Sequence, residues 1–253
     1  MARPHDSIAS VWSRCGSAIA STFARCGAAI TSVFATPVNI SSDFLEVGTV
    51  AAATVWINDL FDEAIATVLS SHVGNSGVIW TRHPSYGNTA VVEAGIGSLS
   101  GRGAIAPTAY VSDAASEPST DDYRVIIGLL MYTDTVNDMG VVARFNPASD
   151  NGILFWFNRT GQSGRLELYH NGGALLWSSN QVLGIGVERE VELRVIGNKA
   201  FLFYEGVERT PLGGVTVVIT TGRRVGPRFY QFGDSTPSTG LHMTRLRVEA
   251  IAA

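Results

Sequence analysis

From Asp59 to the end of the sequence, short segments of apolar or alternating residues recur, separated by Gly, Asn, Asp and Pro. About twelve strands joined by turns are typical of an antiparallel sandwich or barrel. Because no helical periodicity separates the segments, a sheet of strand–helix–strand units is excluded, and we expect an all-β fold. The segments are 78–81, 89–94, 124–132, 140–145, 152–158, 164–169, 174–178, 190–196, 200–204, 214–220, 228–232 and 242–249.

Composition fits this prediction and argues against several classes of protein. Charged residues make up 16% of the chain, against about 25% in ordinary soluble domains. Low charge together with 27 Gly is typical of a turn-rich β protein, and of a subunit that hides surface in an assembly. The net charge of −4 argues against a nucleic-acid binder, which needs a basic excess. Since no run of 18 apolar residues is present, we expect no membrane span.

Residues 7–36 differ from the rest because they carry an eleven-residue repeat, which ends at Pro37. Eleven residues over three helical turns is about 3.67 residues per turn, a period that keeps one helix face apolar and favours a right-handed supercoil. We therefore expect residues 1–36 to form an α-helical segment that oligomerises or docks on a partner. Its apolar face would consist of Ile8, Trp12, Cys15, Ile19, Phe23, Cys26, Ile30 and Phe34.

Two other interpretations of residues 1–36 stay open. The segment is rich in Arg and Ser and poor in acidic residues, as an organellar transit peptide is, and an amphipathic helix can also pack on its own domain. A secretory signal is disfavoured because Arg14 and Arg25 interrupt the apolar stretch. Cys15 and Cys26 would lie roughly 16 Å apart along a straight helix, too far for a disulfide within it.

Three stretches of the β region predict particular elements. Residues 123–132 alternate only weakly and should form a central strand, whereas 241–251 alternate and should return to the sheet. Residues 190–206 predict a hairpin that turns at Gly197-Asn198. The glycine-rich stretch 95–103 lacks the Gly-Lys-Ser/Thr step of a phosphate-binding loop, so we expect an ordinary loop there.

Two of these regions resemble a known family. Residues 192–206, ELRVIGNKAFLFYEG, look like the late hairpin of concanavalin A-like lectin/glucanase and laminin-G-like jelly rolls. Residues 59–84 are similar to the opening of such domains in virion proteins of tailed bacteriophages. The resemblance would cover 59–253, and it leaves 37–58 as a linker or first strand. The residues that match the opening are Asp59, Phe61, Leu69, Ser70, Ser71, His72 and Trp80.

The resemblance implies a two-sheet antiparallel jelly-roll sandwich whose concave groove binds glycans, holds a glucanase site or serves as a rigid virion module. Fold alone does not settle function. Our leading hypothesis is a structural virion protein of a tailed phage, such as a head decoration, fibre or tail appendage, assembled in the host cytoplasm. Residues 1–36 would join it to other virion proteins as a homotrimer, and the jelly roll would bind host surface glycans. The alternatives are a free-standing carbohydrate-binding module and a glucanase-like hydrolase; we do not expect an enzyme.

Oxygen-bearing side chains gather in the predicted loop 133–140, which reads TDTVNDMG. Asp134, Asn137 and Asp138 are candidates for contact with a ligand or a metal ion, because carboxylate and amide oxygens suit both. Aromatic side chains on the strands are candidates for stacking against sugar rings, although most such residues belong to cores. Trp156 is chosen among them; the others are Tyr169, Trp177, Phe203 and Tyr230.

Three further sets of residues invite a chemical role. Glu188, Glu190 and Glu192 alternate on one strand, as the acids of a glucanase do, but the Asp between acids is absent and a solvated outer face is expected. Asp121-Asp122 with Glu117 could bind calcium, though a polar loop is expected and no cofactor is predicted. The five histidines show no zinc-binding spacing, so we predict no metal centre.

Overall fold

A computed structural model describes residues 53–102, 107–133, 137–160, 163–170, 173–218, 222–231 and 236–251. The chain divides into two units, Met1–Val50 and Ala51–Ala253, and every described residue belongs to the second. The predicted helix over 1–36, with its apolar face and both cysteines, lies outside the described residues. It therefore stays a prediction.

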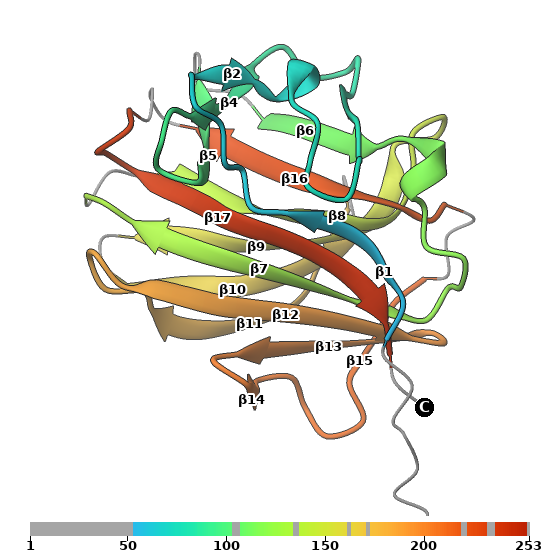
Figure 1. The fold of residues 1–253 in the computed structure, drawn as a ribbon. Coiled ribbons are helices and arrows are strands. Elements are labelled where there is room, and N and C mark those ends of the chain that lie inside the picture. Colours follow the sequence, from blue (N-terminus) through green and yellow to red (C-terminus); the bar gives the residue numbers. More distant parts are fainter. Residues whose placement is uncertain are drawn as a thin grey trace, which may run out of the picture. The chain divides into compact units, whose positions relative to one another are not determined.

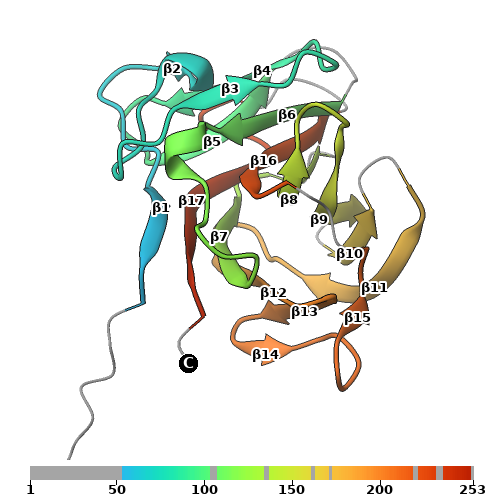
Figure 2. The same ribbon diagram turned by 90° about the vertical axis from the view of Figure 1, so that its right-hand side faces the viewer.

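The second unit consists of two antiparallel sheets that face each other (Figures 1 and 2). Successive neighbours in the larger sheet are β14 (Val207–Glu208), β13 (Lys199–Tyr204), β12 (Glu188–Ile196), β7 (Tyr123–Met131), β17 (Leu241–Ala250), β5 (Ser98–Arg102), β4 (Thr89–Glu93) and β2 (Thr67–Val68). Two further strands complete its ten: β1 (Val55–Asp59) pairs with β17, and β15 (Val215–Thr216) pairs with β13.

The second sheet has seven strands. In order they are β11 (Leu175–Val182), β10 (Ser163–His170), β9 (Asn151–Thr160), β8 (Asn137–Asn146), β16 (Arg224–Gln231), β6 (Pro107–Ser112) and β3 (Trp80–Arg82). Helix in the described residues is confined to two 3-10 turns, η2 (Leu69–Ser71) and η3 (Ala114–Ser116). No helix among those residues is long and apolar enough to cross a membrane. The prediction of an all-β fold with two antiparallel sheets is confirmed.

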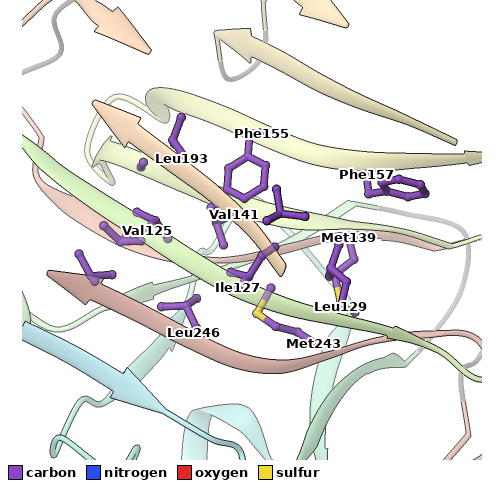
Figure 3. Packing of buried hydrophobic residues seen from close by; sticks show 14 of the residues in the cluster. Val125, Ile127, Leu129, Met139, Val141, Phe155, Phe157, Leu193, Met243 and Leu246 are labelled. Atoms are coloured by element: carbon purple, nitrogen blue, oxygen red, sulfur yellow. The ribbon is translucent and has the colours of Figure 1, made fainter. Parts of the chain in front are cut away.

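The core fills the space between the sheets. Val125, Ile127 and Leu129 alternate along β7, are fully buried, and lie among residues of the opposite sheet such as Val141 and Phe155 (Figure 3). This period of two is what a strand with one buried face requires. β7 lies between β12 and β17, so it is the central strand that its sequence predicted. Truncating a core ring such as Phe155 to Ala would cost about 3–5 kcal/mol.

β17 carries a bulge that explains a glycine in β7. Its register shifts between Met243 and Arg245, which leaves Thr244 beside Gly128. A Cβ atom at Gly128 would come within 2.1 Å of the Thr244 hydroxyl oxygen. Only glycine therefore lets the two central strands approach this closely.

The predicted loop at 95–103 is wrong for its middle part, because β5 occupies Ser98–Arg102 and pairs with β4 and β17. The buried residues of β5 include polar ones. Ser98 Oγ lies 2.9 Å from Nδ1 of His242, and Ser100 Oγ donates to the Glu93 carboxylate. The buried serines of β5 are satisfied by hydrogen bonds, so the strand needs few apolar residues. Hydrophobic periodicity in the sequence therefore did not reveal it.

A buried arginine ties together one end of the sandwich. Arg144 lies in a bulge of β8 with a positive φ of 46° and is almost fully buried. Its guanidinium donates to the backbone oxygens of Gly197, at 2.6 Å, and Asp121, at 2.7 Å. Its backbone N–H donates to the Tyr123 hydroxyl at 2.6 Å. Burial is the main reason why the pKa of Tyr123 is raised well above its ordinary value. Arg144 thus joins β7, β8 and the β12–β13 turn.

Candidate functional site

The structure brings together two of the four residues predicted to contact a ligand. Asp138 in β8 and Trp156 in β9 lie on adjacent strands, and their neighbours along each strand point into the core. Both therefore point to the outer face of the seven-stranded sheet. Asp134 lies outside the described residues. Asn137 begins β8, and its side chain is not described.

Two tyrosines flank Trp156 on this face. The ring of Tyr169, from β10, stands edge-on to the indole, with centroids 6.1 Å apart and an interplanar angle of 80°. The ring of Tyr230, from β16, does the same at 6.3 Å and 72°. All three rings are half-buried. Edge-to-face contacts of this kind contribute about 0.5–1.5 kcal/mol beyond the area they bury.

A buried carboxylate holds the cluster. Glu167 on β10 pairs directly opposite Trp156 and is only 1% exposed. Its Oε2 accepts hydrogen bonds from the indole Nε1 of Trp156 at 3.2 Å, Nδ2 of Asn158 at 3.0 Å and the Tyr169 hydroxyl at 2.8 Å. Its Oε1 lies 3.1 Å from the guanidinium of Arg165. We call the surface formed by Asp138, Trp156, Asn158, Glu167, Tyr169 and Tyr230 the aromatic face.

The acidic residues of the aromatic face affect its tyrosine. Burial, the hydrogen bond to Glu167 and the charges of Glu167 and Asp138 raise the pKa of Tyr169 to about 12. The phenol therefore stays protonated near neutral pH and acts as the donor to Glu167.

The backbone beneath the tryptophan has no room for a side chain. Gly140 on β8 pairs with Trp156, and a Cβ there would lie 2.0 Å from the Phe155 oxygen and 2.4 Å from the Trp156 Cα. On the same outer face, Trp156 and Tyr169 pack against a second apolar cluster, whose buried members include Val142 and Leu154. The indole is thus seated in a close-packed surface rather than on a mobile loop.

A tyrosine in the loop between β3 and β4 contacts Arg228 of the seven-stranded sheet. The Tyr86 hydroxyl accepts a hydrogen bond from Nη1 of Arg228 at 2.9 Å and lies 3.3 Å from the Asp150 carboxylate. The Arg228 guanidinium also lies 4.9 Å from the Tyr86 ring centroid. Arg228 on β16 pairs with Gly140 on β8, which in turn pairs with Trp156, so one strand lies between Arg228 and Trp156.

The other two aromatic candidates lie elsewhere. Trp177 on β11 is half-buried and packs against the main core. Phe203 on β13 belongs to the ten-stranded sheet, where the guanidinium of Arg194 lies 4.1 Å from its ring centroid. Neither residue is part of the aromatic face.

The three alternating glutamates form an ion-pair network. They lie on β12 in the ten-stranded sheet, away from the aromatic face. Arg245 Nη2 lies 2.6 Å from the Glu190 carboxylate and its Nη1 3.6 Å from that of Glu188. Arg194 Nε lies 2.5 Å from Glu192. Because these carboxylates form ion pairs with arginines, we interpret them as structural groups of the sheet.

The carboxylates considered for calcium are also engaged by other residues. Asp122 accepts a hydrogen bond from the Gly197 N–H at 2.7 Å, and the guanidinium groups of Arg223 and Arg224 lie 3.0 Å from Asp121 and 2.9 Å from Glu117. Within the described ranges, no group of three or more His, Cys, Asp or Glu side chains is arranged to hold a metal ion.

The sequence did not reveal that the buried His72 lies between two carboxylates. Its Nε2 lies 2.9 Å from the fully buried Asp59, and its Nδ1 lies 2.6 Å from Glu63. Asp59 also accepts from the indole of Trp80 at 2.7 Å. Burial lowers the pKa of His72, but the hydrogen bonds with the two carboxylates outweigh it, so the pKa is raised. These contacts fasten the end of β1 to η2 and β3.

No family model and no curated protein matches the chain. Among solved structures it is similar to the carbohydrate-binding module CBM66 from Bacillus subtilis, with a TM-score of 0.50 and 11% identity over 68% of this chain and 95% of that one. The Bacillus licheniformis beta-glucanase gives a TM-score of 0.48 and 11% identity, covering 74% of this chain and 98% of that one. The Caenorhabditis elegans galectin LEC-6 gives 0.35 and 14%, covering 50% and 81%. The β domain therefore has a jelly-roll fold similar to that of the carbohydrate-binding module.

Proposed function

We propose that the chain is a glycan-binding protein and that the aromatic face is its binding site. The observation that carries the proposal is the placement of Trp156 between Tyr169 and Tyr230, with its indole N–H held by the buried Glu167 on the neighbouring strand. An aromatic ring held in one orientation on a rigid sheet is a preorganised surface, which lowers the entropy cost of binding.

The chemistry of the aromatic face suits a sugar ring. A pyranose has apolar C–H faces and a rim of hydroxyl groups. The indole and phenol rings can cover the first, while the half-buried amide of Asn158 can bond the second. Such a mixture of aromatic surface and a few oriented polar groups is typical of small-ligand sites.

Hydrolysis fits the aromatic face less well than binding does. A general acid must donate a proton to the leaving oxygen. The partners of Glu167 at Oε2 include the indole N–H of Trp156 and the amide N–H of Asn158, which can only donate. Oε2 of Glu167 is therefore occupied as an acceptor by neighbouring side chains, which fits a structural role.

For the biological setting, we propose a structural virion protein of a tailed phage that displays this β domain on the particle as a head decoration, fibre or tail appendage. The eleven-residue repeat in residues 7–36 supports a helical segment that assembles with other virion proteins as a trimer, and the low charge suits a subunit with covered surface. The ligand in this setting is a polysaccharide of the host surface.

The test is binding of the full chain to a panel of immobilised bacterial surface polysaccharides. Wild type should bind at least one saturably, and Trp156→Ala should bind it roughly tenfold or more weakly, which corresponds to about 1.4 kcal/mol. Phe203→Ala, which removes a half-buried ring from the other sheet, is the matched control and should bind like wild type. Absence of wild-type binding across the panel, or equal loss in both variants, would contradict the proposal.

A further inference from the structure

The edges of the two sheets are protected to different degrees. An edge strand presents unpaired N–H and C=O groups to other chains, and proteins often blunt edges by keeping the strand very short. β2 and β14 have two residues each, and β3 has three. β11, at the end of the seven-stranded sheet, has eight residues. Of the strands that end the two sheets, it is the one long enough to support a ladder with another chain.

β11 also lacks the side chains that protect edges. Its sequence, LLWSSNQV, contains no charged residue and no proline, the two kinds of residue that discourage pairing. Leu175 and Val182, at its two ends, are 46% and 58% exposed. Among the described residues its ladder is formed with β10 alone, and the Val182 carbonyl accepts from the Tyr204 hydroxyl at 2.5 Å.

We propose that β11 pairs antiparallel with β11 of a second copy of this chain. In a two-fold interface the strand faces itself, so a charge near its middle would lie close to the same charge of the partner. β11 carries none, whereas its neighbour β10 carries Arg165 and Glu167. A strand free of charge meets no like charge in any register that the two-fold axis allows.

The pairing would join two seven-stranded sheets into one. Ser178 and Asn180 of β11 pair with Glu167 and Arg165, so they point to the same side as the aromatic face. A two-fold axis perpendicular to the sheet keeps both aromatic faces on that side. Five interstrand spacings of about 4.8 Å then separate the two Trp156 residues, roughly 24 Å across the strands. This bivalent display rests on the proposed function, whereas the strand pairing does not.

Charge placed on the edge tests the pairing. Asn180 is exposed in β11, and when the two-fold axis passes Ser179 a lysine at position 180 would lie two positions from the partner's lysine. Light scattering on the full chain should give Asn180→Lys and Asn180→Asp half the mass of wild type. An equimolar mixture of the two variants should recover the wild-type mass, because opposite charges then meet. Thr81→Lys, exposed on the short β3 at the opposite edge of the same sheet, is the matched control and should keep the wild-type mass.

A second measurement locates the contact independently of any assembly by residues 1–36. Amide hydrogen exchange in peptides covering 175–182 should be slower in wild type than in Asn180→Lys. Equal masses of wild type and Asn180→Lys, or equal exchange in 175–182, would overturn the pairing.

The glycan arms of the experiment separate this inference from the proposed function. Asn180→Lys should bind a soluble monovalent glycan as wild type does, but lose roughly 100-fold in apparent affinity for a densely coated surface. A halved mass of Asn180→Lys, together with no glycan binding by wild type, would support the pairing and overturn the proposed function. Glycan binding by wild type, together with an unchanged mass of Asn180→Lys, would support the proposed function and overturn the pairing.

Discussion

The indole N–H of Trp156 on β9 donates to the carboxylate of Glu167, which lies directly opposite on β10, over 3.2 Å. Because Glu167 also accepts from Asn158 and Tyr169, three side chains on the outer face share one buried acceptor. The carboxylate, rather than any ring, therefore fixes the geometry of the aromatic face. Such a cooperative unit responds as a whole to the loss of one member.

Replacing Glu167 by Ala should weaken glycan binding about as much as Trp156→Ala does, although Glu167 is nearly inaccessible to a ligand. The same change should lower the pKa of Tyr169 from about 12, because a hydrogen bond and a negative charge that raise it are removed. Ultraviolet titration of the phenols measures this shift. Arg165→Ala, which removes only the half-exposed partner of Glu167, is the control. An unchanged Tyr169 pKa in Glu167→Ala would contradict the assigned role.

Arg144→Met should lower the free energy of unfolding by about 3 kcal/mol. The change removes the hydrogen bonds that the buried guanidinium donates to the carbonyls of Asp121 and Gly197, and a hydrogen bond to a charged group contributes about 1.5–3 kcal/mol. Urea unfolding followed by tryptophan fluorescence measures the effect. Arg165→Met, at a side chain 52% exposed, should change stability by no more than about 0.5 kcal/mol. Similar losses in both variants would show that Arg144 does not join the strands.

His72 should stabilise the fold in acid rather than in alkali. Its folded pKa is raised, so its contribution is fully present below the unfolded value of about 6.5 and is lost as the pH rises through the folded pKa. The stability difference between wild type and His72→Gln should therefore shrink as the pH increases. Unfolding by urea at a series of pH values measures this difference.

His242 provides the opposite case and serves as the internal control. Burial lowers its pKa, so its contribution is present above about pH 6.5 and is lost as the pH falls through the folded pKa. The two residues should thus show opposite trends in the same buffers. Parallel trends for the His72 and His242 variants would contradict the environments described for them.

Removing residues 1–36 should reduce the oligomeric state without unfolding the β domain. The described core lies entirely between residues 57 and 248, so residues 37–253 retain it. We expect light scattering to show a larger assembly for the full chain than for residues 37–253. Equal masses would leave a helix that docks only on a different protein, or a targeting segment.

Several features followed from the sequence because they depend on local pattern. The nearly continuous apolar run in residues 123–132 is a property of successive residues, and it predicted the central strand that the structure contains. Alternation in β10 places Glu167 between Leu166 and Leu168, and so on the face away from the core. The polar strand β5 escaped this reasoning, because its buried serines depend on partners distant in sequence.

Only the tertiary structure decided which outward residues meet. Trp156 and Tyr230 are far apart along the chain and become neighbours through the order β9, β8, β16. Strand order and register depend on contacts across the whole sandwich, which a local pattern does not contain. The sequence by itself therefore determined the class of fold and the direction of many side chains. The packing of two sheets decided that an indole, two phenols and a buried carboxylate form one surface.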